Sequence, residues 1–207
     1  MYHELLSDAT FWAFLFTIDQ DLAEHCRKDG CGCGGRLHRA NYPRKPAGGP
    51  RDLPVEYRYR LSFCCARDGC RKRATPPSVR FLGRKVYLGA VVILVAAMRQ
   101  GPTPRRVREL RELFGVSHRT IYRWRDFWNE HFPKTTFWRV ARARLVPVFE
   151  IVDFPRSLWE AFVRGGDDRA GWGKLLRFLS PITITKGLEI KLSDDRDQPA
   201  EDASRRC

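Results

Sequence analysis

Two groups of cysteines are the residues of this chain whose types and spacing most directly suggest chemistry. Cys31 and Cys33 flank a glycine, and Cys64, Cys65 and Cys70 follow further along the chain. Two close cysteine pairs separated by a strand-forming segment are typical of a zinc ribbon, in which two tight turns direct four thiolates at one tetrahedral ion. The neighbouring glycines suit such turns, because glycine adopts positive φ angles at little steric cost. We therefore expect one structural Zn²⁺, bound by Cys31, Cys33, Cys65 and Cys70.

The choice of the third ligand depends on strand alternation. The segment from Val55 to Phe63 alternates in the manner of a strand, and Cys65 continues its apolar face whereas Cys64 continues the arginine side. The two spacings, C-x-C and then C-x4-C or C-x5-C, differ from the commoner C-x2-C knuckle, so Cys64 remains the alternative. Cys26 and Cys207 have no close partner and are not expected to be ligands. The competing interpretation is a set of reduced cysteines that bind no metal.

A second candidate site lies between Pro102 and Phe132, where the pattern predicts two helices joined by a sharp turn. Gly115 suits the left-handed residue that ends a helix, Val116 can fill the angle between the helices, and Ser117 suits the N-cap of the second helix. This is the spacing of a helix-turn-helix. Apolar residues recur at i, i+3 and i+7 in both helices, as Val107, Leu110 and Phe114 and then as Ile121, Trp124 and Trp128.

The opposite face of the second helix is polar and basic. Arg119 and Arg123 are one turn apart, where like charges repel by a few tenths of a kcal/mol, and this favours a polyanionic partner. Arginine can bind phosphate or the O6/N7 edge of guanine, so we expect double-stranded DNA to be read by Arg119, Tyr122 and Arg123. A solvated charged face on an ordinary helical hairpin is the alternative. The expected DNA-contacting residues are Ser117, His118, Arg119, Thr120, Tyr122 and Arg123 on the second helix, Arg105 and Arg106 on the first, and Arg39, Arg44 and Lys45 in the loop between the cysteine groups.

The charge distribution also favours a nucleic-acid partner. The 207 residues carry a net charge of +14, and residues 27–144 contain 28 basic and 8 acidic groups, a net charge of +20. Residues 1–26 contain five acids and no lysine or arginine. A basic middle with neutral or acidic ends is the distribution expected of an electrostatic footprint on a polyanion.

No segment has the features of a targeting or membrane-spanning sequence. The apolar stretch from Leu5 to Ile18 is interrupted by Asp8, lacks a basic region before it and is too short to span a bilayer. We therefore expect a cytoplasmic protein without a membrane partner. Thiols stay reduced in that compartment, which favours metal binding by the clustered cysteines over disulfides.

The remaining elements must position the two sites. The expected fold class is α+β, mostly α. The chain should begin with an N-terminal amphipathic helix in residues 1–25, followed by a small four-cysteine zinc ribbon with a basic Pro/Gly loop in 26–82. A trihelical helix-turn-helix domain in 83–132, short C-terminal helices in 133–188 and a disordered tail in 189–207 should follow. A strand at 79–82 should close the ribbon, and 83–100 should supply the first helix of the trihelical domain. The loop at 38–54 is too rich in Pro and Gly for regular structure, and either lies along DNA or is solvated.

The N-terminal helix, expected at residues 3–26, has a broad aromatic and aliphatic face that must pack against something. Docking on the protein's own core is one solution, and a homodimer contact is the other.

A strand-transfer enzyme is the obvious catalytic alternative, since such enzymes use metals held by three carboxylates. The acids downstream of the predicted helix-turn-helix fall in a helical, proline-broken region, and too few residues follow to form the α/β domain that the site needs. Asp167 and Asp168 suit a turn and an N-cap better. We therefore expect a protein that is not an enzyme.

A cysteine ribbon followed by a helix-turn-helix resembles the N-terminal DNA-recognition part of bacterial insertion-sequence transposases. The strings PPSVRFLGRKVYLGAVV and RELRELFGVSHRTIYRWRDFW are similar to stand-alone bacterial proteins labelled transposase-like. The resemblance covers about residues 26–132 and implies zinc ligation by the four cysteines and a DNA-reading helix at Ser117–Arg125. The catalytic domain of the family is missing, so the expectation is a transposase-like or regulatory DNA-binding protein. The alternatives are a truncated or accessory transposase or nuclease, and an assembly factor that binds a protein.

Overall fold

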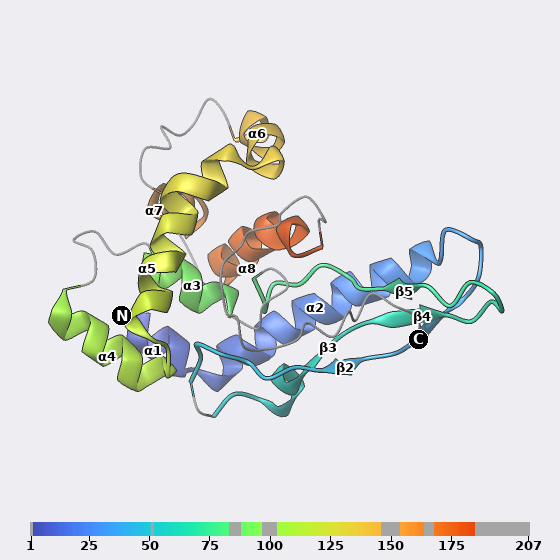
Figure 1. Cartoon of the computed structure of the whole chain (residues 1–207), viewed down its shortest axis with the longest axis horizontal. Coiled ribbons are helices and arrows are strands. Elements are labelled where there is room, and N and C mark those ends of the chain that lie inside the picture. Colours follow the sequence, from blue (N-terminus) through green and yellow to red (C-terminus); the bar gives the residue numbers. More distant parts are fainter. Residues whose placement is uncertain are drawn as a thin grey trace.

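The fold is mixed α+β and mostly helical. The computed structural model describes residues 2–50, 52–82, 88–96, 103–145, 154–163 and 168–184. The predicted tail at 189–207, which includes Cys207, lies outside these residues. Helices dominate, and two small antiparallel sheets lie alongside α2, with β2 and β3 near the middle of the molecule and β4 and β5 towards one end (Figure 1). No described helix is both long enough and apolar enough to span a membrane.

A long helix, α2 (Ala9–Asp29), runs along the long axis of the molecule towards the end where β4 and β5 lie (Figure 1). At about 1.5 Å per residue it is about 31 Å long. The predicted single N-terminal helix is in fact divided, because α1 (Tyr2–Ser7) ends before Asp8. The Asp8 carboxylate accepts a hydrogen bond from the backbone N–H of Thr10 at 2.8 Å, so it caps a new helix instead of continuing the first. The apolar face of α2 is buried within the same chain, through Phe11, Trp12, Leu15 and Ile18.

The cysteine-bearing region contains five short strands. A three-stranded antiparallel sheet has the order β1 (Leu37–Arg39), β4 (Phe63–Cys65) and β5 (Arg73–Ala74). A second, two-stranded sheet pairs β2 (Tyr42–Pro43) with β3 (Tyr59–Arg60). The expectation that the loop at 38–54 lacks regular structure was therefore wrong in part. Proline is tolerated in β2 because this is a two-residue edge strand.

The predicted strand from Val55 to Phe63 is interrupted. Residues Val55–Arg58 form a 3₁₀ turn, and only Tyr59–Arg60 and Phe63–Cys65 are extended. The physical reason is Tyr57, whose ring is fully buried and whose hydroxyl donates to the carbonyl of Trp12 at 2.9 Å. This contact draws the chain at Tyr57 into the core. In a regular strand, the side chains of this segment would instead have pointed alternately to the two faces of the sheet.

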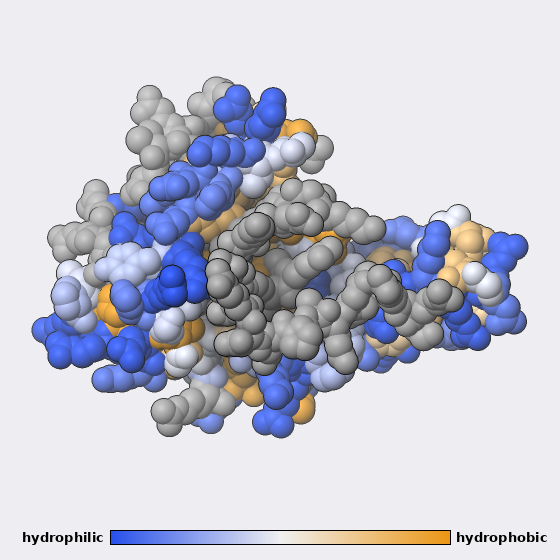
Figure 2. Space-filling view, viewed as in Figure 1, coloured by the Kyte–Doolittle hydropathy of each residue, from blue (hydrophilic) through white to orange (hydrophobic). Residues whose placement is uncertain are grey.

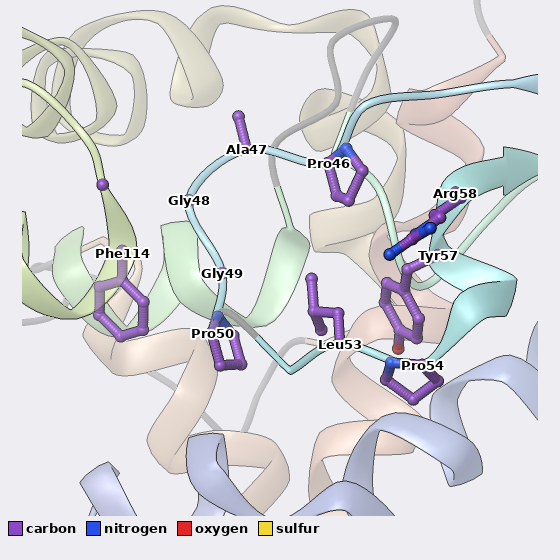
Figure 3. Close-up of a pocket in the computed structure, with 11 residues that line it drawn as sticks. Pro46, Ala47, Gly48, Gly49, Pro50, Leu53, Pro54, Tyr57, Arg58 and Phe114 are labelled. Carbon is purple, nitrogen blue, oxygen red and sulfur yellow. The ribbon is translucent and has the colours of Figure 1, made fainter.

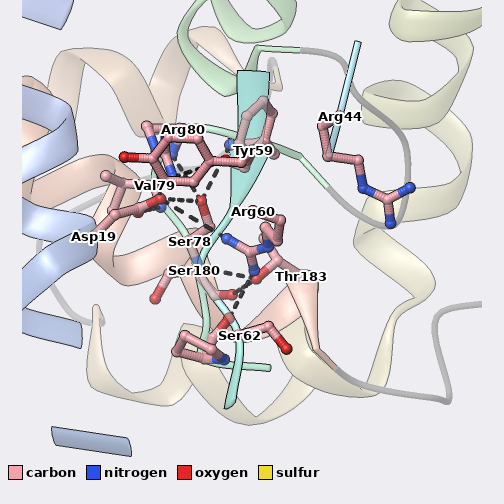
Figure 4. Close-up of polar contacts among 12 residues, drawn as sticks. Asp19, Arg44, Tyr59, Arg60, Ser62, Ser78, Val79, Arg80, Ser180 and Thr183 are labelled. Atoms are coloured by element: carbon pink, nitrogen blue, oxygen red, sulfur yellow. Dashed lines mark hydrogen bonds and ion pairs between the residues drawn. The ribbon is translucent and has the colours of Figure 1, made fainter. Parts of the chain in front are cut away.

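The predicted strand at 79–82 was also wrong. The backbone N–H of Val79 donates to the buried carboxylate of Asp19 at 2.6 Å, and the Ser78 hydroxyl donates to the same carboxylate at 2.6 Å (Figure 4). A side-chain acceptor thus replaces the carbonyl that a neighbouring strand would have offered. The third strand of the sheet is β5 instead.

The second half of the described chain is helical. Its elements are α3 (Gly89–Ala96), α4 (Pro104–Phe114), α5 (His118–Asp126), a π-helical turn (Phe127–His131), a 3₁₀ turn (Phe132–Lys134), α6 (Thr136–Ala141), a 3₁₀ turn (Arg142–Arg144), α7 (Arg156–Val163), α8 (Asp168–Leu179) and a final 3₁₀ turn (Ser180–Thr183). Helix α3 packs against α5, α7 and α8, and α8 also packs against α2. One continuous hydrophobic core therefore joins helices from the N-terminal, middle and C-terminal parts of the chain.

A second, smaller core lies under the cysteine-bearing sheet. It contains Leu37, Leu61, Phe63 and Cys65, and Ala23 of α2 packs into it. The long helix therefore contributes to both cores and connects them.

Candidate metal centre and nucleic-acid interface

Four cysteine sulfurs lie together at the end of the molecule where α2 stops. The Sγ atoms of Cys31, Cys33, Cys65 and Cys70 all lie within 4.8 Å of one another. The Sγ atoms of Cys31 and Cys70 are 3.7 Å apart, and those of Cys33 and Cys65 are 3.5 Å apart. Four thiolates around a tetrahedral ion with metal–sulfur bonds of about 2.3 Å have sulfurs about 3.8 Å apart. The cluster therefore has the dimensions to hold one metal ion.

Each cysteine pair is presented by a tight backbone turn. In the first, the N–H of Gly34 donates to the carbonyl of Cys31 at 2.7 Å, and Gly34 has a φ of 80° that favours glycine. In the second, the N–H of Cys70 donates to the carbonyl of Arg67 at 3.1 Å, after Gly69 with a φ of 79°. The sequence therefore places its glycines where two opposing turns require them.

Gly35 allows the two turns to approach each other. A Cβ atom at this position would lie 2.5 Å from the Sγ atom of Cys65 and 2.9 Å from the Cβ atom of Arg67. Carbon atoms do not approach sulfur or carbon this closely without displacement of the backbone. Only glycine fits at this point without separating the two cysteine pairs.

Backbone N–H groups point at the sulfurs and favour their deprotonated form. The N–H of Gly35 is the main reason that the pKa of Cys33 is lowered to about 6. The N–H of Arg67 donates to the Sγ atom of Cys65 at 3.4 Å and lowers its pKa, but burial and the three neighbouring cysteines outweigh this bond and raise the pKa of Cys65 to about 12. Metal ions bind thiolates rather than thiols, so such donors suit a metal centre.

The structure brings Cys65, and not Cys64, into the cluster. In β4, Cys65 pairs with Leu37 over the small core, and Cys64 pairs with His38 and Arg73 in the neighbouring row. Successive side chains of a strand point to opposite faces, so the two adjacent cysteines cannot serve one site. Cys26 packs against the same small core but is not one of the four clustered cysteines.

The second candidate site is the turn between α4 and α5. The N–H of Gly115, which has a φ of 62°, donates to the carbonyl of Arg111 at 2.9 Å. Val116 is buried in the angle, and the Ser117 hydroxyl accepts a hydrogen bond from the N–H of Thr120 at 3.2 Å. The inner side of the pair is buried at Val107, Phe114, Ile121, Trp124 and Trp128, and Leu110 is half-buried.

The outer side of α5 is polar. His118 and Arg119 are exposed, and the ring of Tyr122 is 42% exposed and packs edge-on against His118 with centroids 5.4 Å apart. Thr120 and Arg123 are half-buried. Figure 2 shows hydrophilic residues over the outer side of the α4 and α5 region.

The other expected contact residues differ in how they are engaged. On α4, Arg105 is exposed and its Nε atom lies 3.1 Å from Oε1 of Glu109, while the side chain of Arg106 is outside the described part of the chain. In the loop, Arg39 and Lys45 are exposed. Arg44 is half-buried, and its guanidinium lies 4.6 Å from the centroid of the Tyr42 ring, within cation–π distance.

The loop from Pro46 to Pro50, which we call the strap, links the sheets to the α4–α5 turn. Gly48 lies against this turn: a Cβ atom there would lie 3.1 Å from the Trp124 ring and 3.2 Å from Val116. The strap also lines a cavity of about 390 Å³ together with Tyr57, Arg58 and Phe114 (Figure 3), and Gly115 is a further lining residue. The strap itself is therefore packed against the α4–α5 turn.

Two cationic residues near the sites, Arg58 and Arg73, are not among the contact residues expected from the sequence. The Arg73 guanidinium donates to the Ala40 carbonyl at 2.8 Å and lies 5.4 Å from the centroid of the Tyr42 ring. Arg58 is exposed beside the cavity. The available signal was the basic composition of the segments around the cysteines, which could suggest the charge but not its location.

Comparison with protein-family models, with curated proteins and with solved structures found no match for this chain.

Proposed function

We propose that the protein is a zinc-dependent, sequence-specific DNA-binding protein, transposase-like or regulatory, that carries out no chemistry of its own. The observation that carries the proposal is the outer face of α5. Exposed His118, Arg119 and Tyr122 project from the first turns of a helix whose inner residues Ile121 and Trp124 are completely buried. The early turns of the second helix are the part that enters the major groove in helix-turn-helix proteins.

The geometry of the α4–α5 turn supports a helix-turn-helix interpretation. A left-handed Gly115, a buried Val116 and the capping Ser117 fix the angle between the helices. A reading helix must be held rigidly, because a hydrogen bond to a base edge depends on the side chain's position. In this proposal Arg119, Tyr122 and Arg123 read bases, and Arg105, Arg39, Arg44 and Lys45 contact phosphates.

Zinc is the metal that the chemistry of the cluster favours. Four thiolates in a tetrahedral arrangement are the donor set of structural zinc sites, although iron can occupy the same set. With four protein ligands no coordination position remains for water, so the ion would stabilise the fold and would not act as a catalyst. Zinc would hold together the sheet formed by β1, β4 and β5.

A homodimer formed through the N-terminal helix is not favoured by the packing of α2. The residues that would supply an apolar interface, Phe11, Trp12 and Leu15, are already buried inside the chain. An assembly factor that uses this helix would meet the same difficulty. The resemblance to transposase DNA-recognition regions remains part of the proposal and rests on sequence strings alone.

Selection of duplexes from a random pool by the purified, zinc-loaded chain tests the proposal. We expect a preferred sequence to emerge, and Arg119→Ala and Arg123→Ala each to weaken binding to it by about 1–3 kcal/mol while relaxing the choice of one base. Arg177→Ala, on α8, is the matched control and should leave the preference unchanged. Failure to enrich any sequence, or equal weakening on preferred and scrambled duplexes, would contradict the assignment of α5 as the reader. Cleavage or joining of the duplex in the presence of Mg²⁺ or Mn²⁺ would instead support the transposase or nuclease alternative.

A further inference from the structure

Seven cationic residues lie in or next to the two small sheets and form no salt bridge with any acid that the structure describes. The nearby Arg27 and Arg71, by contrast, are paired with Glu24 and Asp68. Five are exposed, and Arg44 and Arg73 are half-buried. We call these residues the ribbon track: Arg36, Arg39, Arg44, Lys45, Arg58, Lys72 and Arg73.

The ribbon track is connected from the metal cluster towards the α4–α5 turn. The carbonyls of Arg36 and Lys72 accept hydrogen bonds from the N–H groups of Ala66 and Cys65, at 2.9 and 3.0 Å, which places these two residues beside the cluster. Their position marks the end of the track that is remote from α5.

The middle of the track is built around one aromatic ring. The guanidiniums of Arg44 and Arg73 lie 4.6 and 5.4 Å from the centroid of the Tyr42 ring. The N–H of Arg44 in turn donates to the carbonyl of Arg58 at 2.7 Å. Arg58 and Gly115 line the same cavity, so the track ends at the turn that precedes α5.

Helix α2 sets the length of this arrangement. At one end of this helix, the Trp12 carbonyl accepts a hydrogen bond from Tyr57, and Tyr57 lines the same cavity as Gly115. At the other end, α2 stops at Asp29, two residues before the first clustered cysteine. The stretch from Trp12 to Asp29 spans about 26 Å. Figure 1 shows α4 and α5 at one end of the molecule's long axis and the β4–β5 end at the other. On a duplex that rises about 3.4 Å per base pair, this separation corresponds to about eight base pairs.

We propose that the ribbon track holds the phosphate backbone of the duplex that flanks, on one side only, the sequence read by α5. This inference rests on the proposed function and extends it. The protein would contact DNA at two places, with α5 in the groove of the preferred sequence and the ribbon track on the phosphates to one side of that sequence. A row of guanidiniums and ammoniums matches a row of phosphates, and such contacts position a protein on DNA without reading its sequence. The strap would keep the two parts of the footprint in a constant relative position.

The test uses the preferred duplex from the selection experiment, extended by about eight base pairs on one side or on the other. We expect the extension on one side to tighten binding about tenfold and the extension on the other side to have an effect of less than about twofold. The double variant Arg36→Ala/Lys72→Ala should lose the gain from extension while its affinity for the unextended duplex stays unchanged. Arg27→Ala is the matched control at the same end of the molecule, and should keep the gain.

Three results would overturn the inference while leaving α5 as the reader. The first is equal affinity for all extended duplexes, and the second is a gain that persists in Arg36→Ala/Lys72→Ala. The third is that an acidic peptide binds the ribbon track while extension of the duplex does not change the affinity for DNA. This result would indicate that the track binds an acidic protein. If no sequence is enriched in the selection, the proposed function fails, and this inference fails with it. Circular dichroism and zinc content of each variant would show that the fold is retained.

Discussion

Asp19 and Arg80 form a completely buried ion pair, with Arg80 Nε 2.7 Å from Asp19 Oδ2 and the two side chains 1% and 0% exposed. The same carboxylate accepts hydrogen bonds from Ser78 and Val79 (Figure 4). The Arg80 guanidinium also donates to the carbonyl of Glu56 at 2.6 Å. The pair therefore joins the long helix, the segment after the sheets and the turn that bears Tyr57. An acid of the N-terminal helix thus stabilises the interior.

Asp19→Asn should be strongly destabilising. The substitution leaves the guanidinium of Arg80 buried without its counter-ion, and removal of one partner of a buried pair costs about 3–5 kcal/mol. The measurement is the free energy of unfolding from urea titration monitored by tryptophan fluorescence.

Asp21→Asn is the matched control for that variant, because Asp21 pairs with Arg177 at 3.1 Å while both side chains are about half exposed. Its loss should change the free energy of unfolding by less than about 1 kcal/mol. Equal destabilisation by both variants would mean that burial of Asp19 does not determine its importance.

Gly35→Ala should abolish metal binding at the cysteine cluster. The added methyl group would lie 2.5 Å from the Cys65 sulfur, so the two turns would have to separate. Gly32→Ala is the control in the same turn, since nothing lies within 4 Å of the corresponding position. Metal content by elemental analysis should be about one per chain for the control and close to zero for Gly35→Ala. A fully loaded Gly35→Ala protein would show that the cluster does not hold the ion in this arrangement.

Removal of the metal by a chelator should unfold the cysteine-bearing sheet and leave most of the helical core intact. The sheet has only a small core of its own, centred on Leu37, Leu61 and Phe63, whereas the helices share a larger one. Metal binding and folding are coupled in units this small. Hydrogen exchange should show loss of protection in β1, β4 and β5, with α8 still protected. Uniform loss of protection throughout the chain would indicate a single cooperative unit.

Gly48→Ala should disturb the strap. The residue has a φ of 74°, which costs an alanine about 1 kcal/mol or more, and the methyl group would lie 3.1 Å from the Trp124 ring. Gly69→Ala has almost the same φ of 79° with nothing within 4 Å, so it isolates the backbone strain from the contact. We expect a changed tryptophan emission only for Gly48→Ala, and a larger loss of stability than for Gly69→Ala. Identical behaviour of the two variants would argue against close packing of the strap on α5.

The parts of the fold that could be predicted from sequence are those specified by short spacings. The cysteine pairs with their glycines, and the inward-facing Ile121, Trp124 and Trp128, follow from local periodicity and turn chemistry. The mixed α+β class with mostly helix followed from the same patterns.

The parts that could not be predicted depend on partners distant in sequence. Asp19 meets Arg80 sixty-one positions later, and Tyr57 bends a predicted strand because its hydroxyl bonds to Trp12, forty-five positions earlier. A Pro/Gly composition likewise indicates a loop at Gly48 but says nothing of the Trp124 ring against which it packs. Periodicity describes which face is buried, and it does not identify what covers that face.

The ion pairs of α2 also constrain the order in which the protein can fold. Asp8 pairs with Arg169 and Asp21 pairs with Arg177, contacts that join residues 161 and 156 positions apart. Domains dominated by such distant contacts fold slowly, because a long loop must close before any contact forms. During synthesis from the N-terminus, α2 is therefore made early, and the part of its aromatic face that packs against Trp172 stays uncovered until α8 has been made. That interval exposes a hydrophobic helix to aggregation, and a chaperone that binds apolar segments would find its substrate there.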